Sequence, residues 1–361
     1  MLKLDKFVID LKIGGFEINN FDLFQSLVIE QHSGGILPSF ELVLSLPDTK
    51  IMKEFKINKL ITIGFGKTDA DLRYYKFRLV NFSSTLVDDN GFTIFLSGIA
   101  DVLDYIFNTK IEVFNDKASY QTLKGGVSSL TPKIEYTDSC IQHWIRYNIS
   151  EKQFVENVLE RTFIPNSYPI FGLNIEKKLF VYDAKKQFAK SPKVTFKHQD
   201  VQSDTIVGFE SMSIESNNVL QNFMSSGKEL ISLEPKNWKR KTHKTNLNSL
   251  NGKNYYDKTL NTKYTTEIDS YNTHSKYFDA KVNNYSKWNQ LQMYKVNLVV
   301  VNQFVPNNIL TILDPVKLVT HQGQHQYDEL SGKYLVESII YKISRERTSQ
   351  RFILVRDFIN D

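Results

Sequence analysis

The sequence predicts a mainly β protein, with two small β-barrels in one chain and an inserted α/β domain. Three observations predict this fold class. First, 25 Phe and 18 Tyr stand against only 16 Gly and 9 Pro in 361 residues, a balance typical of β-rich globular proteins. Second, short apolar runs with turn signals between them fill both ends of the chain. Third, the order of these runs near the N-terminus recurs near the C-terminus.

Region 1–105 is predicted to form the first barrel. Seven runs rich in β-branched and aromatic residues are separated by Gly, Pro and Asp-Asn-Gly turn signals. They are KFVIDLKI, GGFEI, LFQSLVIEQ, SFELVLSL, LITIGFG, YYKFRLVNFSSTLV and FTIFLSGI. So many short strands in about 100 residues favour a sandwich or a barrel. Asp88 and Asp89 could be interpreted as a catalytic pair of general acid and general base, but DDNG is typical of a hairpin turn.

Region 106–203 is predicted to form the inserted α/β domain. SYQTLKGGVSSL and SEKQFVENVLERTF have the spacing of amphipathic helices. In the second stretch Ser150 is the expected N-cap, and Gln153 would complete a capping box. One stripe of that helix is expected to face a core: Phe154, Val155, Val158, Leu159 and Phe163. The chain then returns to extended structure in GLNIEKKLFVYD.

Regions 204–235 and 291–361 are predicted to form the second barrel. TIVGFESMSIES, YKVNLVVV, NILTIL and KYLVESIIYKISRERTSQRFILVRD repeat the order of elements in 1–105. The block 236–290 between them is rich in Asn, Lys, Thr and Tyr and poor in aliphatic residues, so it cannot build a sizeable core alone. We therefore expect it to be a polar insertion at the rim of this barrel.

The last hairpin carries apolar residues on both alternating sets of positions. One set holds Tyr334, Val336 and Ile340, and the other holds Leu335, Ile339, Tyr341 and Ile343. A hairpin with one solvent-exposed face should instead alternate apolar and polar residues. We therefore expect a neighbouring barrel or the inserted domain to cover its second face.

Composition and motifs give no support to a catalytic site. With one cysteine, Cys140, no intrachain disulfide can form, and a buried small apolar side chain is expected there. His321 and His325 have a spacing that would suit a metal on a helix, with Asp328 or Glu329 as a third ligand. Their Gly- and Gln-rich context, however, predicts a loop between strands. We expect no enzyme activity, no cofactor and no metal site.

Net charge and hydropathy argue against a nucleic-acid-binding protein and against a membrane protein. The chain has 45 Lys and Arg against 40 Asp and Glu, a net charge of +5, which is too small an excess to indicate nucleic acid as the main partner. The N-terminus alternates and carries charge, and no run approaches about 18 apolar residues. We expect no stable membrane insertion, and a protein synthesised in a reducing cytoplasm.

The polar block supplies the candidate partner-contact residues. Its basic cluster KNWKRKTHK surrounds a tryptophan, a pattern that can bind phosphates. Nearby acidic residues, however, lower the positive electrostatic potential of the cluster, which favours a partner-facing loop. Aromatic residues follow through the rest of the block. The candidates are Trp238, Arg240, Tyr255, Tyr256, Tyr264, Tyr277 and Trp288.

Two stretches resemble a known family. GKYLVESIIYKIS followed by RFILVRD resembles the closing hairpin of the baseplate hub proteins of contractile-tailed bacteriophages, and of the matching N-terminal hub part of VgrG spike proteins of type VI secretion. HWIRYNISEKQFVENVLERT followed by LNIEKKLFVYD resembles the inserted domain of that family. The resemblance implies two tail-tube-like β-barrels in each chain. Three chains would then present six similar barrels to a hexameric tail tube.

The resemblance also implies a structural role in the virion. The homotrimer would join the tail tube protein to a trimeric central spike and would contact other baseplate proteins, while DNA could pass through the ring without specific binding. VgrG chains continue into a needle, whereas this sequence ends at Asp361, so the spike is expected to be a separate protein. The alternative is a cell-wall polysaccharide hydrolase or a carbohydrate-binding protein of a tail tip. A hydrolase would need two carboxylates across a cleft, and the sequence places no such pair.

Overall fold

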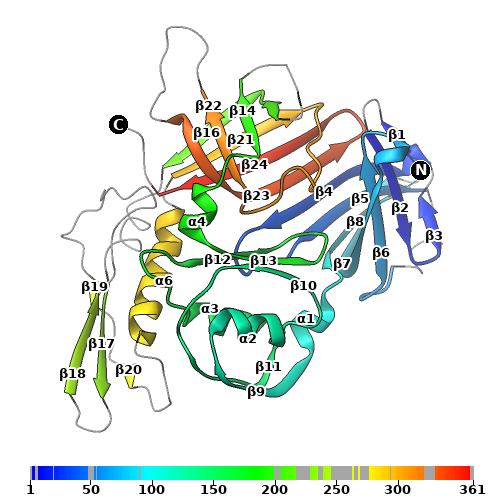
Figure 1. Ribbon diagram of the computed structural model, residues 1–361. Coiled ribbons are helices and arrows are strands. Elements are labelled where there is room, and N and C mark those ends of the chain that lie inside the picture. Colours follow the sequence, from blue (N-terminus) through cyan, green and yellow to red (C-terminus); the bar gives the residue numbers. More distant parts are fainter. Residues whose placement is uncertain are drawn as a thin grey trace.

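The computed structural model shows two β units joined in one continuous sheet, with an α/β domain packed on one face of it (Figure 1). The structure describes residues 2–4, 7–18, 20–47, 53, 55–88, 91–198, 203, 205–216, 228–234, 239–244, 262–263, 267–268, 276–292, 294–320 and 330–357. None of the helices in these ranges has the length and apolar character needed to span a membrane.

The first unit is built from the short apolar runs near the N-terminus. Its central strands pair in the order β4 (Phe24–His32), β5 (Ser39–Leu46), β8 (Gly91–Ala100), β7 (Arg73–Asp88) and β6 (Leu60–Gly66). Beyond β6 the sheet continues through β2 (Phe7–Ile13), with β1 (Leu2–Leu4) and β3 (Phe16–Ile18). Two single-turn 3-10 helices, η1 (Phe21–Leu23) and η3 (Asp69–Asp71), lie in its loops. Burial alternates along β5, as expected for a sheet with one solvent-exposed face.

The second unit repeats this strand order. Its central strands pair in the order β16 (Ser211–Ser216), β21 (Tyr294–Val301), β24 (Thr348–Arg356), β23 (Gly332–Ser344) and β22 (Pro315–Val319). Beyond β22 lie the parallel strands β14 (Val194–Lys197) and β15 (Ile206–Gly208). The order of elements expected from the sequence repeat is therefore present. The sheet of this unit also includes β14, which precedes the expected boundary at residue 203.

A β-bulge occurs at the same place in both units. The register shifts after Leu79 in β7 and after Val336 in β23, and a bulge adds one residue that reverses the alternation of faces. Tyr334 and Val336 therefore lie on the same face as Ile339, Tyr341 and Ile343, and all five are fully buried. The sequence-based assignment of these five residues to two opposite faces was wrong because it assumed an unbroken alternation. Leu335 and Ile340 do lie on the opposite face and are buried as well, so the second face is covered there, as expected.

The predicted barrels are not closed. Among the described strands, neither unit has a pairing that joins its two ends. Instead, the outer edge of β4 in the first unit pairs antiparallel with β23 of the second unit. This contact between distant parts of the chain cannot be derived from local patterns, and it turns two units into one sheet.

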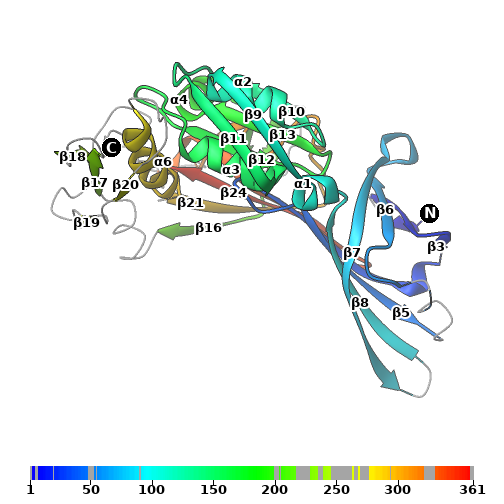
Figure 2. The same cartoon turned by 90° about the horizontal axis from the view of Figure 1, so that it is seen from below.

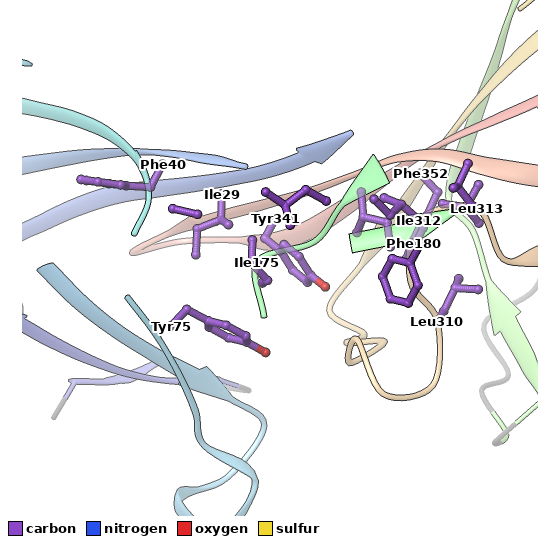
Figure 3. Close-up of a cluster of buried hydrophobic side chains, with 14 of the residues drawn as sticks. Ile29, Phe40, Tyr75, Ile175, Phe180, Leu310, Ile312, Leu313, Tyr341 and Phe352 are labelled. Carbon is purple, nitrogen blue, oxygen red and sulfur yellow. The ribbon is translucent and has the colours of Figure 1, made fainter. Parts of the chain in front are cut away.

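The predicted strand NILTIL is also absent. Residues 307–309 and 312–313 form turns, and the backbone of Leu313 is left-handed, with φ 65°. The strand follows directly, as β22. The apolar residues Leu310, Ile312 and Leu313 are nevertheless buried, and they belong to the same buried cluster as Phe352 of β24 (Figure 3). The apolar character of this run thus reflects core packing rather than extended structure.

Among the described residues, the inserted α/β domain packs on one face of the sheet (Figure 2). Its elements are α1 (Leu103–Phe107), β9 (Thr109–Lys117), α2 (Ser119–Gly126), β10 (Thr131–Glu135), β11 (Gln142–Ser150), α3 (Glu151–Glu160), β12 (Pro169–Leu173), β13 (Lys178–Asp183) and α4 (Ala184–Ala189). The predicted cap of α3 is confirmed, because Ser150 Oγ accepts a hydrogen bond of 3.2 Å from Gln153 N. Phe154, Val155, Val158 and Leu159 are buried, whereas Phe163 lies beyond the helix end and is half-buried.

A second insertion separates β16 from β21. It contains β17 (Lys228–Glu234), β18 (Lys239–Lys244), β19 (Thr262–Lys263), β20 (Glu267–Ile268) and α6 (Tyr277–Leu291). Because β17 pairs with β18, β19 and β20, it belongs to this insertion rather than to the sheet of the second unit. Helix α6 contacts the α/β domain, where Asn284 Nδ2 donates to Leu159 O at 2.9 Å and to Thr162 O at 2.7 Å. The Asn side chain thereby satisfies carbonyls at the end of α3.

Candidate assembly interface

The junction between β4 and β23 shows how two such units join edge to edge. The strands are antiparallel, with Ile29 opposite Tyr341 and Leu27 opposite Ile343. All four side chains are at most 1% exposed, and Figure 3 shows Ile29 and Tyr341 on the same side of the sheet. The cores of the two units are therefore continuous across the junction, and burial of these side chains stabilises it.

A buried polar network holds the junction in place. Tyr341 donates its hydroxyl to Asn307 Oδ1 at 3.0 Å, and Gln31 Nε2 donates to the same oxygen at 2.6 Å. Gln31 Oε1 in turn accepts from the backbone N of Ile175 in the inserted domain, at 3.4 Å. Burial raises the pKa of the Tyr341 phenol well above its ordinary value, so it stays a neutral donor. Both units and the inserted domain meet at this network.

Two edges of the sheet correspond to this junction but pair with no strand in the part of the chain that the structure describes. In the matching strand orders, β7 corresponds to β23 and β16 corresponds to β4. The outer edge of β7 pairs with β6 only as far as Arg78, and among the described strands none pairs with its continuation. None of them pairs with the outer edge of β16 either. Figure 2 shows the β7–β8 hairpin and β16 at opposite ends of the sheet.

These edges expose apolar side chains where the junction buries them. In the matched registers, Leu86 corresponds to Ile343, Phe82 to Ile339, and Ile214 to Ile29. The three residues at the open edges are 61%, 39% and 45% exposed, in that order, whereas their three counterparts are at most 1% exposed. Exposed apolar edge strands are a liability that proteins normally cover. The two edges are therefore candidate assembly surfaces.

A third apolar surface lies on the ribbon formed by β9 and β11. On its outer face Ile111 stands opposite Tyr147, and Val113 stands opposite Ile145, and all four are exposed. On its inner face Phe114 stacks on Phe154 of α3, with ring centroids 5.6 Å apart. The inner face thus belongs to the core of the inserted domain, and the outer face is a further candidate contact surface.

Only two of the predicted partner-contact residues have described side chains, and both contact their own chain. Tyr277 is buried, with the Arg161 guanidinium 5.3 Å from its ring centroid. Trp288 is half-buried and lies 6.3 Å from the ring of Phe171. Arg240 lies in β18, where the structure describes its backbone only. Outside the described residues lie Trp238, Tyr255, Tyr256 and Tyr264.

The described residues bring no set of metal ligands together. No cluster of three His, Cys, Asp or Glu side chains suited to a metal occurs among them, and His321, His325, Asp328 and Glu329 lie outside them. Cys140 is buried as expected, and burial raises the pKa of its thiol to about 11.

A cleft lies between the β6–β7 loop and residues 304–309. It has a volume of about 700 Å³, and Asp71 is the one carboxylate among the described residues that line it. Glycoside hydrolases of the usual kind use two.

Sequence reasoning did not identify the two open edges. The sequence repeat contained a signal for the β7 edge, because an alignment of SSTLVDDNGFTIFL with IYKISRERTSQRFIL places Leu86 opposite Ile343. The bulges and the β4–β23 pairing, which give this alignment its meaning, are visible only in the folded chain.

Solved structures resemble the chain although sequence comparisons find nothing. No protein-family model and no curated protein matches it. A tail protein from Neisseria meningitidis MC58 is 13% identical, with a TM-score of 0.63 over 97% of both chains. The 43 kDa tail protein of prophage MuSo2 from Shewanella oneidensis is 12% identical, with a TM-score of 0.65 over 97% of this chain and 98% of that one.

A type VI secretion component is also similar. This E. coli protein, itself reported to resemble tail proteins of bacteriophage T4, is 9% identical, with a TM-score of 0.52 over 96% of this chain and 76% of that one. The chain therefore has the fold of these phage tail and type VI secretion proteins, mainly β with an α/β insertion, as the sequence predicted.

Proposed function

We propose that this protein is a structural hub in the tail baseplate of a contractile phage, or of a related injection machine. The observation that carries the proposal is the duplication: two units with the same strand order and the same bulge, joined edge to edge. The similarity in fold to phage tail and type VI proteins supports it. The proposed role is structural and needs no cofactor.

In this proposal three chains form a ring of six similar units. Such a ring can meet a hexameric tail tube with six repeated surfaces, while its threefold symmetry suits a trimeric spike. The insertion between β16 and β21 leaves from the end of a strand pair, where it can reach another component. Trp238, Arg240, Tyr255, Tyr256 and Tyr264 remain the proposed contacts with such a partner.

Electron microscopy of the purified protein tests the proposal. End views should show a closed ring with threefold symmetry and six similar lobes, and adding the tail tube protein from the same tail should place the ring at tube ends. Particles of single chains, or rings of another symmetry, would remove the proposal. Tyr255→Ser with Tyr256→Ser and Tyr264→Ser should keep the ring but weaken co-purification with the spike of that tail.

A further inference from the structure

We propose that neighbouring copies join through the two open edges, with β7 of one chain pairing antiparallel with β16 of the next. The register would be that of the β4–β23 junction inside each chain. This inference rests on the proposed function, because it names the surface through which the ring closes. The occupant of each open edge is thus a second copy of this chain.

The register follows from the matched strands. Leu79 in β7 and Val336 in β23 are the last paired residues before the bulge, so the positions that follow correspond one to one. Ser84 then matches Tyr341, and Leu86 matches Ile343. The pairings of β4 with β5 and of β16 with β21 are matched in the same way, so that Ile214 corresponds to Ile29 and Met212 to Leu27.

Transferring the junction to two copies gives a specific set of opposed residues. Because Tyr341 faces Ile29 and Ile343 faces Leu27 within one chain, Ser84 would face Ile214 of the next copy, and Leu86 would face Met212. Both pairs lie on the face that carries the core. The exposed side chains of Leu86 and Ile214 would then extend the two cores toward each other and be covered.

The opposite face of the same strands is compatible with this pairing. There Thr85 would face Ser213, and Ser83 would face Glu215, so no two like charges stand opposite each other. A serine hydroxyl can donate to the Glu215 carboxylate. The chemistry of both faces therefore permits the strands to add edge to edge, as in β-strand addition between proteins.

A second copy fits these edges better than a different partner because the two edges are unlike and complementary. The central strands of the sheet follow the order β7, β8, β5, β4, β23, β24, β21 and β16. One open edge belongs to the first strand of this series and the other to the last. Joining unlike edges gives a head-to-tail interface, which closes into a ring when the rotation allows. Junctions within chains and between chains would then alternate, and three copies would place six units around one axis.

Disulfide cross-linking tests the register. In the full-length chain, Thr85→Cys combined with Ser213→Cys places thiols at directly opposed positions, whose Cα atoms should lie about 4.5–5.5 Å apart, within the range that a disulfide spans. Mild oxidation should convert the protein into covalent dimers and trimers, and a reducing agent should return them to single chains. Cys140 should contribute no background because it is buried.

Two matched controls define the result. Ser83→Cys with Ser213→Cys shifts the pair by two residues, to about 7–8 Å, and should cross-link at least tenfold less. Val28→Cys with Lys342→Cys occupies the same register position within one chain and should form an intrachain disulfide under the same oxidation. This intrachain disulfide would show that the oxidation forms disulfides between directly opposed residues of two paired edge strands.

The outcomes separate this inference from the proposed function. A threefold assembly in which Thr85→Cys with Ser213→Cys stays uncross-linked, or cross-links no better than the shifted pair, overturns the β7–β16 pairing and leaves the hub intact. A protein that stays monomeric overturns both. Cross-linked trimers that form only with the matched pair support the pairing.

Discussion

Asn58 and Leu313 occupy the same position in the two units and share an unusual backbone. Both are left-handed, with φ 69° and 65°, and each donates its N–H over 2.7 Å to the residue that precedes the bulge. Asn58 N donates to Leu79 O, and Leu313 N donates to Val336 O. Asparagine adopts this conformation readily, whereas leucine does so at a cost. The recurrence of the conformation with unlike residues supports a structural duplication.

The first prediction concerns this shared turn. Asn58→Ala should lower the free energy of unfolding by about 1 kcal/mol, because alanine disfavours a left-handed backbone. Asn58→Gly should not lower it, because glycine adopts that backbone freely. Urea unfolding of both variants checks this difference. Equal stabilities would mean that the turn does not constrain the first unit.

The second prediction concerns pH and the start of α3. Burial of Glu151 acts to raise the pKa of its carboxyl, but hydrogen bonds from Ser129 and Ser128 outweigh burial and hold that pKa below its ordinary value. A lowered pKa gives stability that is present above the ordinary pKa near ~4.3 and is lost as pH falls through the folded-state value.

Glu151→Gln should therefore lower the free energy of unfolding by about 2 kcal/mol at pH 7, where it removes charge-assisted hydrogen bonds. The difference from the unmodified chain should shrink as the pH falls below 4. Glu160→Gln, an exposed position on the same helix, should change stability by less than about 0.5 kcal/mol. Chemical unfolding at several pH values measures both. A pH-independent effect of Glu151→Gln would contradict the assigned role.

The third prediction concerns the contact between α6 and α3. Asn284→Ala should destabilise the protein by about 1–3 kcal/mol, because it removes the side-chain donor to three backbone carbonyls at the end of α3. Amide hydrogen exchange in the last turn of α3 should speed up. Asn157→Ala, on the exposed side of α3, should be neutral or slightly stabilising. Unchanged exchange in Asn284→Ala would show that α6 does not hold α3.

The sequence was sufficient for the local elements and insufficient for their assembly. Alternating apolar runs located the strands of the first unit, and Ser150 with Gln153 located the start of α3. The bulges after Leu79 and Val336 shift the faces by one residue without a local signal. The edge of β4 is taken by β23 from more than 300 residues away, which only tertiary packing decides.

The polar block illustrates the same limit. Its shortage of aliphatic residues predicts that it cannot build a sizeable core alone, and its aromatic residues, Tyr277 and Trp288 among them, are the predicted partner contacts. Within α6, however, Asn283 and Asn284 are buried through hydrogen bonds to backbone carbonyls. Polar residues can thus be buried where their donors are satisfied, and composition alone does not reveal this.

The fourth prediction separates the assembly edges from other exposed apolar surfaces. Leu86→Glu should abolish the assembly and leave the folded chain as stable as before, because the residue is exposed in a single copy and a carboxylate would be buried at the β7–β16 contact. Ile145→Glu, with similar exposure on the β9–β11 ribbon, should keep the assembly. Circular dichroism and light scattering on both variants check this. An intact assembly of Leu86→Glu would place the contact elsewhere.

The mass of the unmodified chain in solution tests the central claim most directly. Native mass spectrometry of the purified protein should give one species with three copies of the 41.9 kDa chain, stable over a tenfold range of concentration. A single 41.9 kDa chain at every concentration, or an assembly with two or four copies, would contradict a ring in which three chains supply six equivalent units.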